Sequence, residues 1–170
     1  GMAIKEGILK ACDAKVIVKP LADGGEGTLD VLLSGTGGRK IQTEVTGPLG
    51  DKTVAYYGII DGKKTAVIEI AQAAGIKLVP GDRLNPLYTT TYGVGEIIKD
   101  AIMRGCRDFI VGIGGSATND GGIGMLNALG YEFFDSEGNA VKPVGNDLIK
   151  VSGISTEKVL RELSECSFRV

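Results

Sequence analysis

Two kinds of hydrophobic spacing alternate along the first two thirds of the chain. Apolar residues at helical intervals predict a helix over 3–12, and a short apolar run predicts a strand over 16–18. Helical spacing returns over 29–33 and again over 92–105, where a Thr-rich cap precedes the segment and a glycine ends it. Strands that alternate with helices in this way are typical of an α/β fold.

A different pattern separates these helical segments. Apolar and polar residues alternate over 41–45, and apolar runs over 53–60 and 65–70 predict two further strands. A turn over 47–51 and the two-residue signal Asp61-Gly62 connect them, which predicts an antiparallel β-meander. Glu69 lies between two isoleucines near the end of the last strand. Solvent-facing alternation would explain it, and a role in a site stays open.

The segment from Asp108 to Leu129 reads as strand, glycine-rich loop and helix. The loop, residues 114–122, carries Ser116, Thr118, Asn119 and Asp120 among its glycines. A glycine-rich turn that leads into a helix leaves backbone N–H groups unpaired at the positive end of the helix dipole, which suits an anion. A plain connection is the alternative, but such loops are usually about two to six residues long. We therefore interpret the loop as an anion site.

A second glycine-rich loop follows the predicted strand 16–18. In the sequence Ala22 to Thr28, three glycines interleave with the carboxylates Asp23 and Glu26, and a helix follows. A tight turn with an acidic helix start would produce the same composition, because acidic residues favour helix N-termini. The position of these carboxylates directly after a strand favours a functional loop.

The C-terminal third is less regular. It contains a predicted strand over 131–134, a turn over 135–138 and a final helix that Thr156 caps; residues 168–170 look like the start of another strand. Because the chain starts inside a helix and stops in a strand, we expect it to be a fragment of a longer protein. We divide it into 1–38, part of a first α/β (Rossmann-like) domain, and 39–170, a second α/β domain with the meander.

The amino-acid composition limits the classes of partner, metal and catalytic mechanism that the chain can use. Of the 170 residues, 43% are hydrophobic and 24% charged, with a net charge of −2, which gives no reason to expect nucleic acid or a membrane as partner. Three dispersed cysteines without a CxxC pair fit free thiols in a cytoplasmic protein. The absence of histidine excludes Ser-His catalysis and His-ligated zinc, so that any metal should be an oxygen-bound ion such as Mg²⁺.

Three kinds of phosphate site remain to be compared. A P-loop requires a lysine, and none occurs between Arg107 and Lys142. A dinucleotide fingerprint, GxGxxA over 112–117 with Asp135 as the ribose ligand, would make the chain a non-catalytic nucleotide-binding domain. It leaves Thr118 to Gly122 and the first loop unexplained. A kinase of a small hydroxy acid explains both loops, because phosphoryl transfer needs amides on phosphates, Mg²⁺ on carboxylates and a carboxylate beside the acceptor hydroxyl.

Three motifs carry a more specific resemblance. ADGGEGT (22–28), NPLYTTTYGVGE (85–96) and GIGGSATNDGGIGML (112–126) occur in an order and at a separation that resemble the bacterial glycerate kinase family. The resemblance implies ATP-dependent phosphorylation of D-glycerate with Mg²⁺ by a two-domain α/β protein whose cleft lies between the domains. It implies that 23–28, Tyr92-Gly93 and 114–122 line that cleft.

From this resemblance we assign roles to individual residues. Asp23 and Asp120 are the expected catalytic carboxylates, and Asp23, Glu26 and Asp120 are the possible metal ligands. The residues expected to bind substrate or phosphate are Gly24, Gly25, Glu26, Gly27, Thr28, Tyr92, Gly93, Gly114, Gly115, Ser116, Thr118 and Asn119.

The sequence also departs from the family pattern. Family members begin with a strand and an Asp-Ser-Phe-Lys-Gly type of loop, whose lysine is the obvious cation for the substrate, and they usually have arginine where this chain has Leu84. Arg83 or Lys19 would have to replace these cations. We therefore expect the chain alone to be incomplete for catalysis. A missing first strand would leave a sheet edge unpaired, which predicts self-association through that edge.

Overall fold

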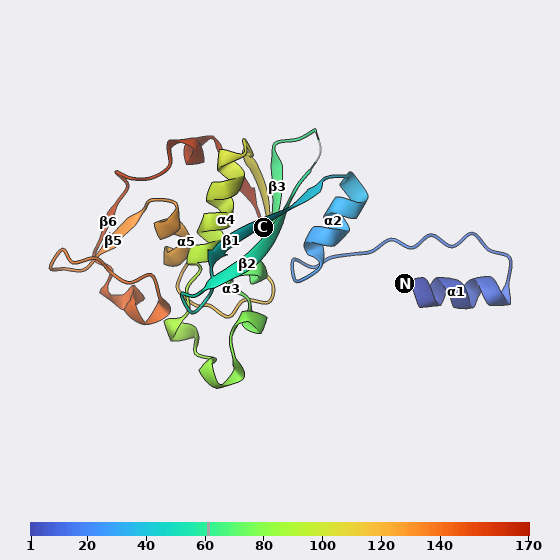
Figure 1. The fold of residues 1–170 in the computed structure, drawn as a ribbon, viewed down its shortest axis with the longest axis horizontal. Helices are drawn as coiled ribbons and strands as arrows, with labels where there is room; N and C mark the ends of the chain where they lie inside the picture. The colour runs from blue at the N-terminus through green and yellow to red at the C-terminus, as the bar shows by residue number, and fades with distance from the viewer. Residues whose placement is uncertain (61) are drawn as a thin grey trace.

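The structure is a computed structural model that describes residues 1–60 and 62–170, and its centre is a five-stranded sheet (Figure 1). The strand order is β1-β2-β3-β4-β7, with antiparallel pairing from β1 to β3 and parallel pairing from β3 to β7. The strands are β1 (Arg39–Thr46), β2 (Lys52–Ile59), β3 (Thr65–Glu69), β4 (Asp108–Gly112) and β7 (Ser167–Arg169). The predicted α/β class with an antiparallel meander is confirmed.

The meander follows the predicted pattern closely. β1 pairs with β2 over its full length, from Arg39 opposite Ile59 to Thr46 opposite Lys52. The turn between them is closed by the Gly47 amide, which donates to the Asp51 carbonyl at 2.6 Å. Gly50 has a φ of 89°, a conformation that glycine adopts without strain. The predicted turn at Asp61-Gly62 includes Asp61, which lies outside the described residues.

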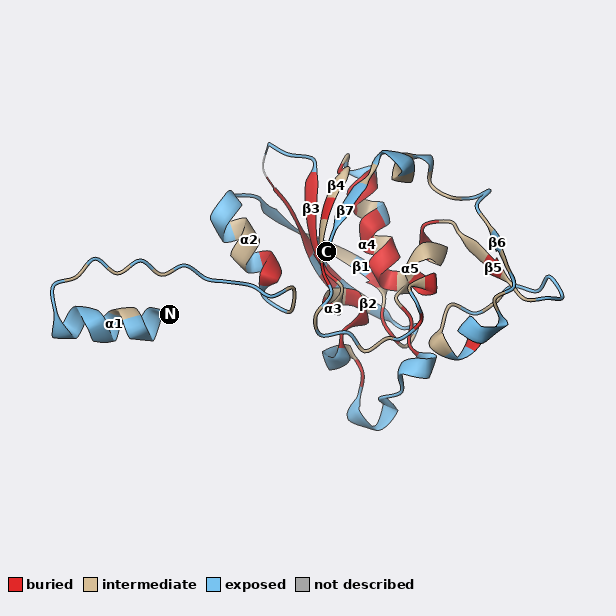
Figure 2. Cartoon of the chain, turned by 180° about the vertical axis from the view of Figure 1, so that it is seen from behind, coloured by how far each residue is buried: buried red, intermediate tan, exposed pale blue. Residues whose placement is uncertain are grey.

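Three helices lie on one side of the sheet: the first two pack on its strands, and the third packs against the second. They are α3 (Ala71–Ala74), α4 (Tyr92–Met103) and α5 (Ile123–Ala128). The apolar stripe of α4, which includes Val94, Ile97 and Ile98, packs with Ile68 and Phe109 of the sheet in the main hydrophobic core. Figure 2 shows that buried residues concentrate in the sheet and in α4. The predicted role of the α4 stripe as core is therefore confirmed.

The helix α2 (Thr28–Thr36) covers the opposite face. Its Leu29 forms a smaller core with Ile60 and Val67, and Leu32 and Leu33 pack against the same group. Val67 lies between Ala66 and Ile68, which face the other core, as the alternation of side chains along a strand requires. The packing of α2 places the start of this helix at the end of β3. The domain boundary between residues 38 and 39 stays a prediction.

The first segment lies beside this body. The helix α1 (Met2–Ala11) forms as predicted, but none of its residues is buried, and an extended segment separates it from α2 (Figures 1 and 2). The predicted strand over 16–18 is wrong, because these residues are extended but pair with no strand in the part of the chain that the structure describes. Without a partner, an extended segment has no ladder of hydrogen bonds to make it a strand.

The C-terminal third adds a small two-stranded sheet, and short 3₁₀ turns occur both there and between α3 and α4. The sheet consists of β5 (Glu132–Phe134) and β6 (Gly153–Ser155), and β7 confirms the strand predicted at the end of the chain. The 3₁₀ turns are η1 (Ile76–Leu78), η2 (Gly81–Arg83), η3 (Pro86–Tyr88), η4 (Gly145–Lys150) and η5 (Arg161–Glu165). Of the helices in 1–60 and 62–170, none is both long enough and apolar enough to cross a lipid bilayer.

The helix predicted after Thr156 is wrong. Leu160 has an extended conformation, with φ −56° and ψ 122°, and its amide donates to the Leu129 carbonyl at 3.1 Å instead of continuing a helical ladder. Leu160 and Leu163 nevertheless pack against the main core. The spacing of these apolar residues therefore indicates that they are buried, but it does not require a helix. An extended segment followed by a short 3₁₀ turn buries them as well.

Candidate active site

The two glycine-rich loops meet in the structure. They are the ADGGEGT loop (residues 22–28), which precedes α2, and the GGSATNDGG loop (residues 114–122), which follows β4. The Gly114 amide donates to the Gly24 carbonyl at 2.9 Å. A Cβ on Gly112 would lie 2.5 Å from the same carbonyl oxygen, so that the backbones could not approach in this way with a larger residue there. The loops thus form one continuous surface at the carboxyl end of β4.

The ADGGEGT loop is held by its own side chains and by the sheet. The Gly25 amide donates to Asp23 Oδ1 at 3.0 Å, and the Gly24 amide donates to Thr28 Oγ1 at 3.1 Å. Gly27 has a φ of 93° where the loop enters α2. Asp23 and Glu26 are exposed, whereas Thr28 is buried. The loop therefore presents two carboxylates to solvent on a fixed backbone.

Glu69 anchors this loop to the sheet. Its side chain is 2% exposed, and Oε1 accepts a hydrogen bond from the Leu29 amide at 2.7 Å in the first turn of α2. Gln72 Nε2 donates to the other oxygen, Oε2, at 3.0 Å. The solvent-facing interpretation of Glu69 is wrong. Since α2 begins immediately after the ADGGEGT loop, the carboxylate of Glu69 fixes where that loop lies.

The GGSATNDGG loop is attached to the segment that follows β3. The Ile76 amide donates to the Gly115 carbonyl at 2.9 Å, and the Ala117 amide donates to the Ala74 carbonyl at 2.8 Å. Ser116 Oγ and Thr118 Oγ1 lie 2.9 Å apart, and Ser116 and Asn119 are exposed. Ser116 and Thr118 line a hollow of about 250 Å³ with residues that begin the NPLYTTTYGVGE motif. Ser116 and Thr118 therefore place two hydroxyl groups beside the apolar side chains that make up most of the lining.

Asp120 has a different environment from Asp23. It is 2% exposed, and its carboxylate accepts hydrogen bonds from the Thr91 amide and hydroxyl, both at 2.8 Å, and from the Gly122 and Gly124 amides at 3.0 and 3.2 Å. Thr91 Oγ1 in turn accepts from the Met125 amide at 2.9 Å. The carboxylate thus joins the start of α4 to the start of α5. Its hydrogen-bonding capacity is largely used by the protein itself.

Tyr92 and Gly93 directly follow Thr91 in this connection. They are the first two residues of α4, and Gly93 lies so close to β1 that a Cβ would be 1.9 Å from the Thr46 carbonyl oxygen. Thr89 Oγ1 donates to the Ala117 carbonyl at 2.8 Å, which attaches the preceding segment to the GGSATNDGG loop. The structure therefore brings the three sequence motifs together, through a backbone hydrogen bond between the two glycine-rich loops and through side-chain hydrogen bonds of Thr89, Thr91 and Asp120.

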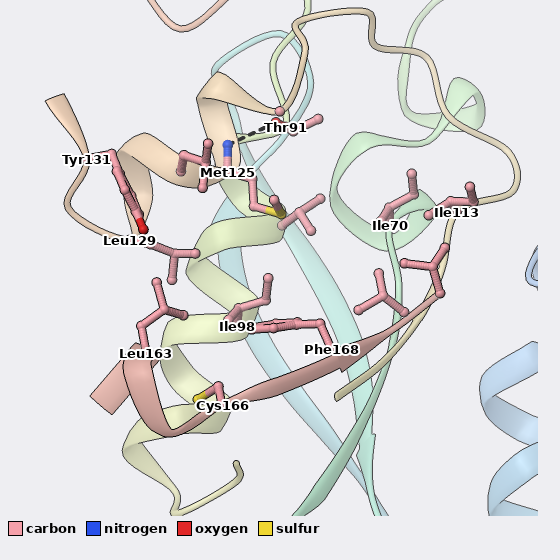
Figure 3. A pocket seen from close by; sticks show the side chains of 15 residues that line it. Ile70, Thr91, Ile98, Ile113, Met125, Leu129, Tyr131, Leu163, Cys166 and Phe168 are labelled. Atoms are coloured by element: carbon pink, nitrogen blue, oxygen red, sulfur yellow. Dashed lines mark hydrogen bonds between the residues drawn. The ribbon is translucent and has the colours of Figure 1, made fainter. Parts of the chain in front are cut away.

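A separate apolar cavity of about 560 Å³ lies between α4, α5 and β7 (Figure 3). Figure 3 shows Ile98, Met125, Leu129, Leu163 and Phe168 around it. Its lining includes no Asp, Glu, Lys or Arg side chain, and its polar groups come from Thr91, Tyr131 and Cys166. Such a lining does not suit a phosphate or Mg²⁺. The loop surface is the better candidate for an active site.

Comparison with known proteins identifies the family of the chain. The glycerate kinase family matches the chain over residues 1–170. The chain belongs to the glycerate kinase family. It is 46% identical over 158 residues to the glycerate kinase of Haemophilus influenzae and 44% identical over 158 residues to the glycerate 2-kinase of Escherichia coli. Each alignment covers 93% of this chain and 42% of the relative.

A solved structure of a family relative has the same fold. The crystal structure of a putative glycerate kinase 2 from Salmonella typhimurium LT2 superposes with a TM-score of 0.86 at 42% identity, over 98% of this chain and 46% of that chain. The chain therefore spans less than half the length of the relatives that it matches. Family membership agrees with the resemblance predicted from the three motifs.

Membership of the glycerate kinase family disfavours the dinucleotide-binding alternative, and the geometry gives a physical reason. Asp135 directly follows β5, which belongs to the small sheet with β6, whereas the strands beside β4 are β3 and β7. Asp135 Oδ1 accepts the amides of Glu137 and Asn139, and the Asn139 amide makes the largest contribution to lowering the pKa of Asp135. This carboxylate closes a turn and does not lie at the strand end where a ribose would bind.

The loop surface of this glycerate kinase family member offers oxygen donors for Mg²⁺. Asp23 and Glu26 are exposed and lie three residues apart. Within residues 1–60 and 62–170, no group of three or more His, Cys, Asp or Glu residues is close enough to bind a metal ion. A Mg²⁺ that takes one or two carboxylates and completes its shell with substrate phosphates needs no larger group. The residues present therefore fit such an ion.

The structure also reveals a basic residue that the sequence analysis missed. Lys77 Nζ, in η1, forms an ion pair with Glu26 Oε2 of the ADGGEGT loop, although 51 positions separate the two residues. Arg83 and Lys19, the expected replacements for the absent family lysine, are exposed. Lys77 belongs to no motif, and only the contact of η1 with the GGSATNDGG loop brings it to the site. No sequence signal could have identified it.

Proposed function

We propose that the protein to which this chain belongs is a kinase that transfers a phosphoryl group from ATP to a hydroxyl of D-glycerate. The observation that supports it is the contact between the ADGGEGT and GGSATNDGG loops, which puts carboxylates, hydroxyls and backbone amides on one surface. Membership of the glycerate kinase family supports the substrate class. Phosphoryl transfer depends mainly on positioning and on neutralising charge, and this surface contains groups for both.

The two loops would have different roles in the reaction. In this proposal the GGSATNDGG loop binds a phosphate or carboxylate group through Ser116, Thr118, Asn119 and the Gly115 amide. Gly114 would position the loop, because its amide donates to the Gly24 carbonyl. Asp23 accepts the proton of the acceptor hydroxyl, or shares Mg²⁺ with Glu26. Mg²⁺ would neutralise charge on the transferred phosphoryl group. Asp120 would contribute by holding the GGSATNDGG loop in place, because its buried carboxylate accepts four hydrogen bonds.

The remaining predicted residues would shape this surface. Gly24, Gly25 and Gly27 allow the ADGGEGT loop to approach β4, and Thr28 holds the Gly24 amide. Tyr92 and Gly93 would fix the start of α4 behind the GGSATNDGG loop. Since the relatives are more than twice as long as this chain, we expect residues outside it to complete the catalytic centre. Use of ATP and the three free cysteines of the described residues favour the cytoplasm as its location.

A coupled assay of ADP release tests the proposed function. It uses D-glycerate, ATP and Mg²⁺ with the protein produced from the longest reading frame that contains this chain. We expect activity that Asp23→Asn lowers by about a hundredfold or more, the size that loss of a general base has in other enzymes. Asp82→Asn, which changes an exposed aspartate in η2, is the matched control and should leave the rate unchanged. Absence of glycerate-dependent ADP release would contradict the proposal.

We also propose that the isolated chain associates through a sheet edge. The outer edges of the five-stranded sheet are β1 and β7, and β7 is short and exposed. An edge strand offers unpaired N–H and C=O groups to a second copy. Sedimentation of the 170-residue chain at high concentration should give dimers or larger species. A monomer at all concentrations would contradict this proposal without affecting the kinase assignment.

A further inference from the structure

The ion pair between Lys77 and Glu26 joins segments that lie on either side of the loop surface. Lys77 belongs to η1, and Glu26 belongs to the ADGGEGT loop. Both side chains are accessible, with 75% of the Lys77 side chain and 45% of the Glu26 side chain exposed. Exposed ion pairs contribute little to stability, because solvent screens them, so a competing charge easily opens this pair.

The backbone beside Lys77 is fixed to the second loop. The Ile76 amide donates to the Gly115 carbonyl, and Gly75 forms a β-bridge with Ser116. Gly75 is buried, and a Cβ there would lie 2.2 Å from the Ala71 carbonyl oxygen, so that a larger residue would not fit this turn as it stands. The ammonium group of Lys77 is therefore tethered by its flexible side chain to a fixed point next to Gly115 and Ser116.

Glu26 lies on the other side of this junction. It lines a hollow of about 340 Å³ together with Asp23 and the start of α2. Ile76, next to Lys77, lines the hollow of about 250 Å³ that contains Ser116 and Thr118. Among the ion pairs of residues 1–60 and 62–170, the Lys77–Glu26 pair is the one that involves either glycine-rich loop.

We propose that Lys77 binds an anionic oxygen of a substrate, and that Glu26 occupies it until the substrate arrives. The anion is a phosphate of the nucleotide or the carboxylate of the hydroxy acid, both of which are oxyanions that an ammonium group binds. When the substrate binds, its oxyanion would replace the Glu26 carboxylate on the ammonium group of Lys77. Glu26 would then be free to turn towards the hollow that contains Asp23. This inference rests on the proposed function, because it assigns a ligand group to that same site.

The test compares Lys77→Gln with Lys99→Gln, which changes an exposed lysine of α4 and serves as the matched control. Binding of ADP and of D-glycerate is measured by calorimetry without Mg²⁺ at low and high salt, with the protein from the longest reading frame that contains this chain. Loss of one charge-assisted hydrogen bond should weaken one ligand roughly tenfold and reduce the salt dependence of its binding. The Lys99 variant should bind both ligands as the unchanged protein does.

Which ligand is affected identifies the anion. Weaker ADP binding and a raised KM for ATP assign Lys77 to a phosphate, whereas weaker D-glycerate binding and a raised KM for glycerate assign it to the carboxylate. Glu26→Gln should tighten the same ligand by a few-fold in the absence of Mg²⁺, because the competing carboxylate charge is removed.

The two proposals fail separately. If the unchanged protein phosphorylates glycerate but Lys77→Gln binds both ligands normally, the role of Lys77 is overturned and the kinase assignment stands. If ligands bind and depend on Lys77 but no glycerate is phosphorylated, the kinase assignment fails and the anion-binding role stands. If neither ligand binds the unchanged protein, both are overturned.

Discussion

Single carboxylates join distant parts of this molecule. Asp120 accepts two hydrogen bonds from Thr91, which lies 29 residues earlier, and Glu69 accepts one from Leu29, 40 residues earlier. Both carboxylates are buried, and N–H or O–H donors surround their oxygens. A buried charge is tolerated when hydrogen bonds of this kind replace the water that it has lost. These two residues therefore fix the position of the glycine-rich loops.

Replacement of Asp120 by asparagine tests this role. Asn keeps one acceptor oxygen but places an NH₂ group opposite N–H donors, so that at least one buried donor loses its partner. We expect Asp120→Asn to lower the free energy of unfolding by about 2 kcal/mol or more. Urea denaturation measures the change, and Asp82→Asn, at an exposed site, should stay within about 0.5 kcal/mol of the unchanged protein. Equal urea midpoints for the two variants would contradict the role of Asp120 in fixing the loop.

Tyr57 gives a prediction for alkaline pH. Burial raises the pKa of Tyr57 well above its ordinary value of 10.0, and the hydrogen bond that Tyr57 Oη donates to Asp100 Oδ2 at 2.7 Å raises it further. The folded state thus keeps this proton above pH 10, where the unfolded chain loses it. The stabilisation is present below about pH 10 and decreases above it, by up to about 1.4 kcal/mol per pH unit.

The matched variant is Tyr57→Phe, which removes the titrating hydroxyl and keeps the ring. Urea midpoints from pH 8 to 11 should fall more steeply for the unchanged protein than for this variant. Other groups titrate in the same range, but they contribute to both proteins and cancel in the difference. Parallel curves for the two proteins would contradict the prediction.

At the scale of single residues, the sequence predicted which loops matter but not what each carboxylate does. Asp23 and Glu26 are exposed, as a role in chemistry requires, whereas Asp120 is buried. The alternation of β3 made Glu69 look solvent-facing because the pattern contains no information about α2, which covers that end of the strand. Lys77 could not be found, because its relation to Glu26 exists only after folding.

Among the elements, the end of β4 and the ADGGEGT loop approach each other closely. Gly112→Ala would place a Cβ 2.5 Å from the Gly24 carbonyl oxygen, and a backbone has to move to relieve this contact. We expect a loss of about 1–3 kcal/mol and faster hydrogen exchange at the Gly114 amide, whose bond to Gly24 would open.

Gly35→Ala is the control for this substitution. Gly35 lies in α2, and no atom lies within 4 Å of the position that its Cβ would occupy, so that alanine should stabilise the helix by about 0.5–1 kcal/mol. A lower free energy of unfolding for Gly112→Ala and a higher one for Gly35→Ala would separate a steric effect from the general preference of helices for alanine. Destabilisation by both, or by neither, would contradict the close approach.

The elements that the sequence predicted well are those with long periodic patterns. α4 has its apolar stripe over three turns, and the meander has alternation and turn signals. The errors fell on short segments, where a few apolar residues fit several conformations. Residues 16–18 lack a partner strand, and Leu160 donates its amide to Leu129, so tertiary contacts decided both cases.

For the molecule as a whole, strand order was the feature that local patterns could not supply. β4 lies between β3 and β7, although about forty residues separate β3 from β4 and more than fifty separate β4 from β7 along the chain. The two glycine-rich loops meet because this order puts the end of β4 beside the end of β3, where α2 begins. Their proximity follows from the sheet, and the motifs alone could not establish it.

The division between this body and α1 leads to a prediction about the whole chain. No residue of α1 is buried, and residues 12–20 are extended and mostly exposed, whereas the sheet and α4 contain the main core (Figure 2). Limited trypsin digestion of the 170-residue chain should therefore cut first after Lys10 or Lys15 and leave the rest as a protected fragment.

Thermal unfolding then distinguishes a detached helix from a contributing one. Removal of residues 1–12 should leave the Tm within about 1–2 °C of the full chain, because almost no apolar area returns to water. Leu29→Ala, which removes a buried side chain from the α2 core, should lower the Tm by several degrees since such truncations cost about 2–5 kcal/mol. A comparable fall on removal of residues 1–12 would mean that α1 packs against the body in solution.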